Sequence, residues 1–433
     1  MPENSCAQRL TAARSESLRI ALFTETFLPS IDGTVTRLCH TIRHLRESGH
    51  QVLVIAPQGG VVEFEGARIH GVPGFPFPLY PELKLAAPRP SIGKALEAFG
   101  PDLIHASQPA LLGASAFYYS SACRVPLVIS YHAQLAKWLY YYGLGRLEPL
   151  LWWGTKTAYN RADLVLATSQ VMQDLLQEQG IRRVELWQRG VDTKDFHPQH
   201  ASQKMRAQLT RGHPEDQVLL YVGRLSAEKE IESCRAVLAA LPGLRLALVG
   251  DGPHRRRLEQ YFAGTPTYFA GYLKGQELAA AFASADVFFL PSRTETLGLV
   301  LLEAMAAGCP VVAAGEGGIL DIVQDGVNGH LYDPTDSSGA ITAIRRLLCD
   351  STHREAVRRQ ARLDAEKWGW AGATQQLEHF YRDVLRREQE LPRQIAEQNG
   401  LGTSADDLCD NLQISRATLR RFMRPRAASN GHH

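Results

Sequence analysis

Two glutamates, Glu295 and Glu303, have the spacing that points most specifically to chemistry in this sequence. The apolar run 287–290 before them predicts a buried strand. A helix is expected to begin near Gly298 and to end at Gly308, a residue type that commonly terminates helices. Glu295 therefore belongs to the loop between strand and helix, whereas Glu303 lies more than one turn into the helix.

Glu303 is expected to bind the two hydroxyl groups of a ribose. Its neighbours in the helix are apolar, and a carboxylate in such surroundings needs a hydrogen-bonding partner. The N–H groups of Leu299 and Val300 lie in the first helical turn, where a phosphate group would be held. The alternative is a glutamate at the solvent edge of an amphipathic helix. We favour a nucleotide site because apolar residues surround Glu303 on nearly all sides.

Two cations, Arg224 and Lys229, follow another apolar run at 218–222. Beyond the end of a strand, both side chains are positioned to reach a diphosphate. Arginine offers a planar fork to such a group, and lysine offers a compact point charge. The alternative interpretation is two solvated surface cations.

Gly33 and His132 are candidate site residues in the first half of the chain. Gly33 follows the first predicted strand and permits close approach of the backbone to a phosphate, although an ordinary strand-to-helix turn would also use glycine. His132 stands at the end of the strand expected at 126–130, where its ring could bond a sugar hydroxyl. A structural histidine with satisfied hydrogen bonds is the alternative.

The elements that must position these residues are short apolar strands that alternate with amphipathic helices. Strands are expected at 18–23, 51–56, 102–106, 126–130, 162–167 and 184–188, and again at 218–222, 244–249, 267–269, 287–290 and 310–313. Nearly continuous apolar strands separated by helices indicate parallel sheets that are covered on both faces. We therefore predict two α/β domains in tandem, with ligands at the carboxyl ends of the strands in the cleft between them.

The domain boundaries are drawn from composition. A polar segment at 192–212 is interpreted as the linker, which gives a first domain at 18–196 and a second at 197–366. Residues 1–17 are expected to be disordered and residues 367–390 to form a helix. Residues 391–433 are read as a polar tail that is helical in part.

Composition excludes several classes of protein. The chain of 433 residues has 47 Lys and Arg against 45 Asp and Glu, so no global field for nucleic acid arises. An apolar run long enough to cross a bilayer is missing, and residues 1–17 lack the apolar core of a secretory signal. The seven cysteines form no C-x-x-C pair, which suits a reducing cytosol.

A metal ion is not expected to serve the site. The sequence has no pair of aspartates in the D-x-D pattern on a polar loop after a strand. Arg224, Lys229 and the N-terminus of a helix would neutralise a leaving diphosphate without a metal.

These motifs, in their order along the chain, resemble the retaining, nucleotide-sugar-dependent glycosyltransferases of family 4, which have two Rossmann-like domains in the GT-B fold. The resemblance covers about residues 18–387. Its strongest mark is the pair Glu295 and Glu303 followed by Gly308-Cys309-Pro310, and the segment from Gly223-Arg224 to Glu228-Lys229 adds to it. Residues 367–387 match the helix with which members of this family cross back onto the first domain.

The resemblance implies a role for each candidate residue. Arg224 and Lys229 would bind the donor diphosphate, with Gly33 letting the first-domain loop approach it. Glu303 would bind the ribose and Glu295 the donor sugar, while His132 would contact the sugar near its anomeric carbon. Retention in this family is thought to need no protein nucleophile. One departure is Glu230, where the family usually has glycine or asparagine after the lysine.

Within the family, the chain most resembles the sulfoquinovosyl-diacylglycerol synthases of cyanobacteria and chloroplasts. Matching stretches are 141–148, 185–193 and 294–298. This resemblance implies UDP-sulfoquinovose as donor and diacylglycerol as acceptor. The subfamily reads Ser-Tyr-His-Thr-His where this chain has Ser130-Tyr131-His132-Ala133-Gln134. Related lipid glucosyl-, galactosyl- and mannosyltransferases share most of the other motifs, and they remain alternatives.

Aromatic side chains crowd into 138–153, and the tentative acceptor and membrane residues are Trp138, Tyr141, Trp152 and Trp153. Amphipathic rings of this kind lie well at the interface of a bilayer, which favours a cytoplasmic protein peripheral on the cytosolic face of a membrane. Packing in the core or between domains is the alternative.

The tail at 403–422 predicts two short helices around residues 413–415, with several arginines in the second. This pattern resembles a helix-turn-helix unit. We favour a plain extension, or a basic arm for anionic lipid, over DNA binding because about 20 residues cannot build a core alone. A nucleotide-sugar epimerase or hydrolase on the same architecture is the competing enzyme class.

Overall fold

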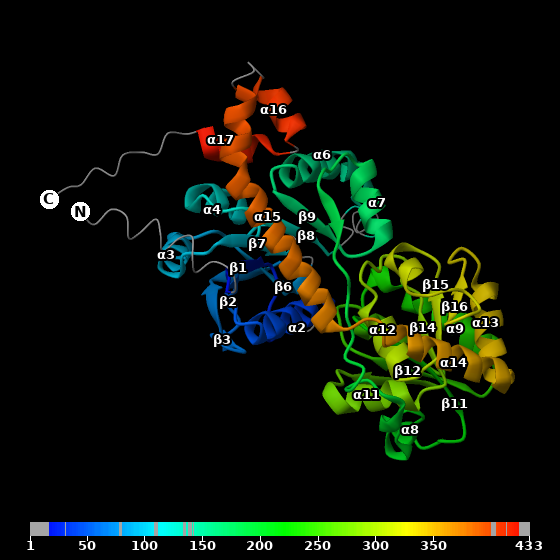
Figure 1. The fold of residues 1–433 in the computed structure, drawn as a ribbon. Helices are drawn as coiled ribbons and strands as arrows, with labels where there is room; N and C mark the ends of the chain where they lie inside the picture. Colours follow the sequence, from blue (N-terminus) through cyan, green and yellow to red (C-terminus); the bar gives the residue numbers. More distant parts are fainter. Residues whose placement is uncertain are drawn as a thin grey trace.

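The computed structural model describes residues 17–30, 32–77, 80–107, 111–132, 136, 141, 143–399, 404–412 and 414–423. Two sheets of parallel strands form two α/β domains that lie side by side (Figure 1). The segment expected to be disordered at 1–17 lies outside the described residues except for Ser17, as do residues 424–433 of the tail.

The first domain contains an eight-stranded sheet in the order β10-β9-β8-β7-β1-β2-β4-β3. Only β3 runs antiparallel to its neighbour. The strands are β1 (Arg19–Thr24), β2 (Gln51–Pro57), β3 (Glu63–Phe64), β4 (Ala67–Val72), β7 (Leu103–Ser107), β8 (Leu127–Tyr131), β9 (Leu164–Ala167) and β10 (Val184–Leu186). A hairpin of β5 (Gly74–Phe77) and β6 (Tyr80–Ala86) forms a separate small sheet.

Alternate residues of the central strand β1 enter two different cores. Ile20 and Leu22 pack with helices α2 (Gly33–Glu47) and α15 (Trp370–Asn399). Ala21 and Phe23 pack with the helices of the opposite face. Those helices are α3 (Pro90–Phe99), α4 (Ser115–Cys123), α6 (Glu148–Tyr159) and α7 (Gln170–Glu178). Burial on both faces explains why the strands read as continuous apolar runs.

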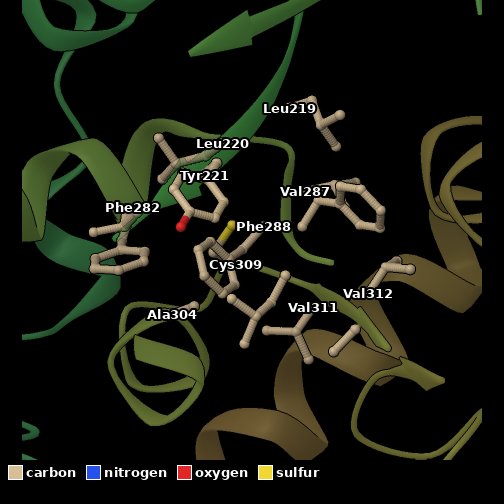
Figure 2. Close-up of a cluster of buried hydrophobic side chains, with 14 of the residues drawn as sticks. Leu219, Leu220, Tyr221, Phe282, Val287, Phe288, Ala304, Cys309, Val311 and Val312 are labelled. Atoms are coloured by element: carbon tan, nitrogen blue, oxygen red, sulfur yellow. The ribbon is translucent and has the colours of Figure 1, made fainter. Parts of the chain in front are cut away.

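The second domain is a six-stranded parallel sheet in the order β13-β12-β11-β14-β15-β16. Its strands are β11 (Gln217–Val222), β12 (Leu244–Val249), β13 (Thr267–Gly271), β14 (Val287–Leu290), β15 (Val311–Ala314) and β16 (His330–Tyr332). Its helices are α8 (Gln203–Leu209), α9 (Cys234–Ala240), α10 (Arg255–Tyr261), α11 (Gly275–Ser284), α12 (Leu299–Ala306), α13 (Ser337–Cys349) and α14 (Ser351–Ala365). Figure 2 shows Phe282, Phe288, Ala304 and Val311 meeting in its core, which fixes α12 against the sheet.

Helix α8 lies inside the segment that was expected to be an irregular linker. Its Met205 and Leu209 are buried in the core of the second domain. Because the surrounding residues are polar, this short amphipathic helix could not be recognised from the sequence. The irregular part of the linker therefore ends before residue 203 and not at residue 212.

Helix α15 continues beyond the expected change of character at residue 391. It passes Pro392 and ends at Asn399. In Figure 1 this long helix starts beside the second domain and crosses the first domain toward α16 (Ala405–Asn411) and α17 (Arg416–Met423). Leu391 and Ile395 at its end form a small core with Leu408 and Leu419. The helices of the tail therefore form a hydrophobic core together with the C-terminal end of α15.

Candidate functional site

Both sheets reverse their order of strands at a point where ligands bind in α/β proteins. In the second domain this switch point lies between β11 and β14. Arg224 and Lys229 follow β11, and Glu295 follows β14, so three predicted site residues come together there. Lys229 Nζ lies 3.0 Å from Glu295 Oε2 and donates a hydrogen bond to it.

Glu295 also holds the beginning of α12. Its Oε1 accepts a hydrogen bond of 3.0 Å from the N–H of Gly298. Gly298 has a φ of 66°, a left-handed conformation that glycine adopts without strain. Burial alone would raise the pKa of Glu295, but the charge of Lys229 and the N–H of Gly298 hold that pKa below its ordinary value.

Leu299 and Val300 form the first turn of α12, and no side chain in the described part of the chain caps that helix with a hydrogen bond. Glu303 follows on the next turn. Burial raises the pKa of its carboxyl to about 7. Among the described residues, no hydrogen-bond or ion-pair partner is found for this carboxylate. A partly buried acidic group without a partner is costly to the fold.

The first domain approaches α12 through the loop after β1. A Cβ atom added to Gly33 would lie 3.9 Å from Leu299 Cδ1 of the second domain. The preceding residue, Asp32, caps α2 by accepting a hydrogen bond of 2.9 Å from the N–H of Val35. Burial lowers the pKa of Arg224 to about 10, while nearby carboxylates, Asp32 among them, act in the opposite direction. Arg224 therefore lies at the boundary of the two domains.

His132 is buried at the end of β8 and belongs to a chain of hydrogen bonds. Its Nε2 lies 2.8 Å from Ser130 Oγ, which lies 3.0 Å from His105 Nε2. His105 Nδ1 in turn lies 2.6 Å from Tyr381 Oη of α15. Burial lowers the pKa of both histidines, so both rings are neutral near pH 7.

The direction of this chain follows from Tyr381. Its hydroxyl is buried and has only His105 as a partner in the described part of the chain, so its O–H donates to His105. His105 then donates to Ser130, and Ser130 donates to His132. We assign the remaining proton of His132 to Nδ1, an atom without a hydrogen-bond partner among the described residues. In this assignment the Nδ1–H of His132 has no acceptor among the described residues.

Several side chains fasten the two domains around the site. Thr296 Oγ1 donates a hydrogen bond of 2.6 Å to the carbonyl of His132. The buried Arg189 donates to the carbonyls of Leu297 and Gly318, and its second nitrogen lies 2.8 Å from Asp321 Oδ2.

Trp370 stacks on His40 and packs with Leu297 and Leu299. It lies at the start of α15, so this helix is anchored directly beside the loop that leads from β14 into α12.

The tentative aromatic residues do not form one continuous surface. Tyr141 donates a hydrogen bond of 2.7 Å to Glu230 of the second domain. Trp152 packs against the first-domain core that α3, α4, α6 and α7 cover, and its Nε1 donates a hydrogen bond to Glu148. Trp153 is 67% exposed, and Trp138 lies outside the described residues. Tyr141 therefore contacts the other domain, and Trp152 packs on the core of its own domain.

The backbone conformation of Glu230 is the one expected for the glycine or asparagine that the family usually has at this position. It has a φ of 51°, the left-handed conformation for which those two residues are suited. The turn after Lys229 is therefore kept although glutamate carries some strain there.

Sequence reasoning missed Arg37, Asp32 and Trp370 as parts of this region. Arg37 is fully buried on α2 and stacks over Trp187, with 3.4 Å between its guanidinium carbon and the ring centroid. A buried arginine in a helix that reads as amphipathic gives no local signal. Only the unusual burial of a charge, visible in three dimensions, distinguishes it.

Two negative findings concern the described residues alone. They contain no cluster of three or more side chains suited to hold a metal ion. None of their helices combines the length and the apolar character that a membrane span requires.

Known protein families match both domains of the chain. The family described as Glycosyltransferase Family 4 matches residues 31–195, and the family described as Glycosyl transferases group 1 matches residues 204–364. The sulfoquinovosyl transferase SQD2 of Arabidopsis thaliana is 40% identical over 83% of this chain and 72% of its own length. A GDP-mannose-dependent alpha-mannosyltransferase of Corynebacterium glutamicum is 34% identical over 87% of this chain and 91% of its own.

The fold has solved counterparts. The crystal structure of HepE from Anabaena in complex with UDP and glucose has a TM-score of 0.69 and 22% identity, and it covers 84% of this chain and 99% of that one. The likeness supports the expected GT-B arrangement of two Rossmann-like domains. The chain belongs to the family 4, group 1 glycosyltransferases, and it is a glycosyltransferase.

Proposed function

We propose that this enzyme moves a sugar from a UDP-sugar to a lipid acceptor with retention of the anomeric configuration. The observation that carries the proposal is the convergence of Arg224, Lys229, Glu295 and the start of α12 at the switch point of the second domain. Cations and free helical N–H groups there suit a diphosphate. Glu303, one turn further along the helix, suits the ribose.

The proposed reaction needs one bond broken and one formed. The bond between the anomeric carbon and the diphosphate oxygen breaks, and the acceptor hydroxyl attacks the same face of the sugar. The departing phosphate oxygen receives the proton of that hydroxyl. Arg224 and Lys229 would stabilise the negative charge on the leaving group, so we propose that no metal ion is required. His132 would donate its Nδ1 proton to a sugar hydroxyl.

Sulfoquinovose is our proposed donor sugar, and diacylglycerol is the proposed acceptor. The 40% identity to a sulfoquinovosyl transferase supports the sugar. The resemblance of residues 141–148, 185–193 and 294–298 to sulfoquinovosyl-diacylglycerol synthases supports the acceptor. Other glycolipid glucosyl-, galactosyl- or mannosyltransferases are the second candidate. The long match to a GDP-mannose-dependent enzyme favours mannose among them.

We further propose that the enzyme acts as a peripheral protein on the cytosolic face of a membrane. The support is an exposed apolar stripe on η1 (Gly145–Leu147) and α6, formed by Leu147, Leu150 and Trp153. Amphipathic surfaces of this kind enter the interface of a bilayer.

A thermal-shift panel of nucleotide sugars tests the donor. UDP-sulfoquinovose should raise the unfolding temperature more than UDP-glucose, GDP-mannose or ADP-glucose, because a ligand that binds only the folded state stabilises it. A larger shift with GDP-mannose would support the second candidate instead. Consumption of the UDP-sugar without any acceptor, giving an epimer or free sugar, would point to the epimerase or hydrolase class.

A further inference from the structure

A large pocket that shares no lining residue with the switch-point site lies between the first domain and the small C-terminal helical unit. Its volume is about 1170 Å³. The end of α4, the ends of α6 and α7, and helices α16 and α17 contribute to its walls. We call it the basic pocket, because its charged lining residues are Arg124, Lys156, Arg161, Arg182, Arg183 and Arg420, together with Arg421.

The charge of the basic pocket is of one sign. It has seven cationic lining residues and no carboxylate among the described ones. Arg124, Lys156, Arg161 and Arg420 have no ion-pair partner within the described part of the chain. Several cations gathered around one hollow repel each other unless an anion occupies the space. The arrangement therefore favours a multiply charged anion as ligand.

Arg421 has a structural role, because it forms ion pairs with two carboxylates. It is 6% exposed and lies 2.8 Å from Asp163 and 2.8 Å from Glu388. Thr418 adds a hydrogen bond of 2.6 Å to Asp163. These contacts use the two nearby carboxylates to fix α17 against the first domain. Neither Asp163 nor Glu388 lines the basic pocket, whereas Arg420 on the same helix does.

The exposed side of α6 connects the basic pocket to an apolar surface. Leu150 and Trp153 are 63% and 67% exposed. Lys156 and Asn160, which line the pocket, follow Trp153 by three and seven residues and share its face of the helix. A surface in which apolar rings lead into a cluster of cations suits a phosphate group at the level of lipid headgroups.

We propose that the basic pocket binds the phosphate group of an anionic ligand, either a phospholipid headgroup or a soluble phosphate compound. Arginine guanidinium groups bind phosphate oxygens in pairs, and the four lining cations without an ion-pair partner among the described residues exceed what a single carboxylate would need. The C-terminal unit, with its helix-turn-helix appearance, is then one wall of an anion site. This inference goes beyond the proposed transfer reaction and does not depend on it.

The test compares the full-length protein with two double variants of equal charge. Arg161→Gln/Arg420→Gln removes two cations of the basic pocket. Arg256→Gln/Arg359→Gln removes two exposed arginines of the second domain and is the matched control. Flotation with phosphatidylcholine vesicles that contain phosphatidylglycerol measures binding to an anionic lipid headgroup. Titration calorimetry with inorganic phosphate and inorganic pyrophosphate measures soluble phosphate.

The proposal predicts binding in at least one arm, weakened roughly tenfold or more in the pocket variant and unchanged in the control. Loss in the vesicle arm alone assigns the site to lipid, and loss with inorganic phosphate or pyrophosphate assigns it to a soluble compound. Equal weakening of both variants would reveal a diffuse charge effect and overturn the proposal. Absence of binding in both arms would also overturn it, as would a site that takes only duplex DNA.

UDP binding by both double variants should equal that of the wild-type protein. This control shows that the fold is intact. It also separates the anion site from the donor site, so either proposal can fail alone.

Discussion

Lys229 Nζ donates a hydrogen bond of 3.0 Å to Glu295 Oε2. Lys229 is proposed to bind the donor diphosphate and Glu295 the donor sugar, so in the free enzyme the charges of these two residues neutralise each other. A donor diphosphate would compete with Glu295 for the ammonium group. Glu295 would then be free to turn toward the hydroxyl groups of the donor sugar. One ion pair thereby couples the diphosphate end of the donor to its sugar end.

Replacing Lys229 by Ala tests this coupling. We expect kcat/KM to fall about 10- to 100-fold, the range for loss of a hydrogen bond to a charged group. Titration calorimetry with UDP should show weaker binding. The matched control is Lys204→Ala, which removes an exposed lysine of α8. An unchanged affinity of K229A for UDP would remove Lys229 from the donor site.

Nucleotide binding should depend on pH through Glu303. The pKa of its carboxyl is raised to about 7 by burial, whereas ribose hydroxyls donate best to the ionised form. Affinity for UDP should therefore fall as the pH decreases below about 7, by nearly tenfold per unit, and should level off above it. Calorimetry between pH 5.5 and 8.5, roughly one unit or more on each side of that pKa, measures this.

The variant Glu303→Gln should bind UDP weakly and with no such pH dependence. It should also unfold at a higher temperature than the wild type at pH 8. The sign follows because a raised carboxyl pKa makes the folded state less stable above that pKa, and glutamine carries no charge to bury. If wild-type and E303Q proteins show the same pH profile, another group is responsible.

The hydroxyl of Tyr381 should influence catalysis from a distance. Tyr381→Phe removes the first donor of the chain through His105 and Ser130, so His132 loses its fixed tautomer. We expect kcat to fall about tenfold, which corresponds to one hydrogen bond, with little change in UDP affinity. The matched control is Tyr159→Phe, another buried tyrosine of the first domain. Equal kcat for Y381F and wild type would contradict a positioning role.

The contact between the segment after β10 and the start of α15 should tolerate no side chain at Gly190. A Cβ atom there would lie 2.6 Å from Cδ2 of the Trp370 ring. Gly190→Ala should destabilise the protein by about 1–3 kcal/mol, the range for overpacking, and should weaken UDP binding because Trp370 packs on Leu299. Gly372→Ala is the control, since space is open there and alanine favours a helix. Thermal unfolding of both variants checks this.

The strands of both sheets could be predicted because burial on two faces leaves a local apolar signature. The expected run 244–249 coincides with β12, and 287–290 coincides with β14. Short elements escaped prediction. The strand β3 has two residues, and α8 is amphipathic within a polar segment. Such elements are stabilised by partners distant in sequence, which a local pattern does not reveal.

The sequence was enough to predict which residues lie near the switch point. Pairings within it were not. Lys229 and Glu295 are 66 residues apart, and His105 and Tyr381 are 276 apart, so no periodicity connects them. The continuation of α15 past Pro392 was also hidden, because proline usually marks the end of a helix.

The central claim is transfer from a UDP-sugar to a lipid with retention, and one assay addresses it directly. The full-length protein is incubated with UDP-sulfoquinovose and vesicles that contain diacylglycerol, and the glycolipid is analysed by NMR. We predict release of UDP in equal amount to a new glycolipid whose anomeric configuration is that of the donor. A glycolipid of inverted configuration, or no transfer from any nucleotide sugar by folded enzyme that binds UDP, would contradict the claim.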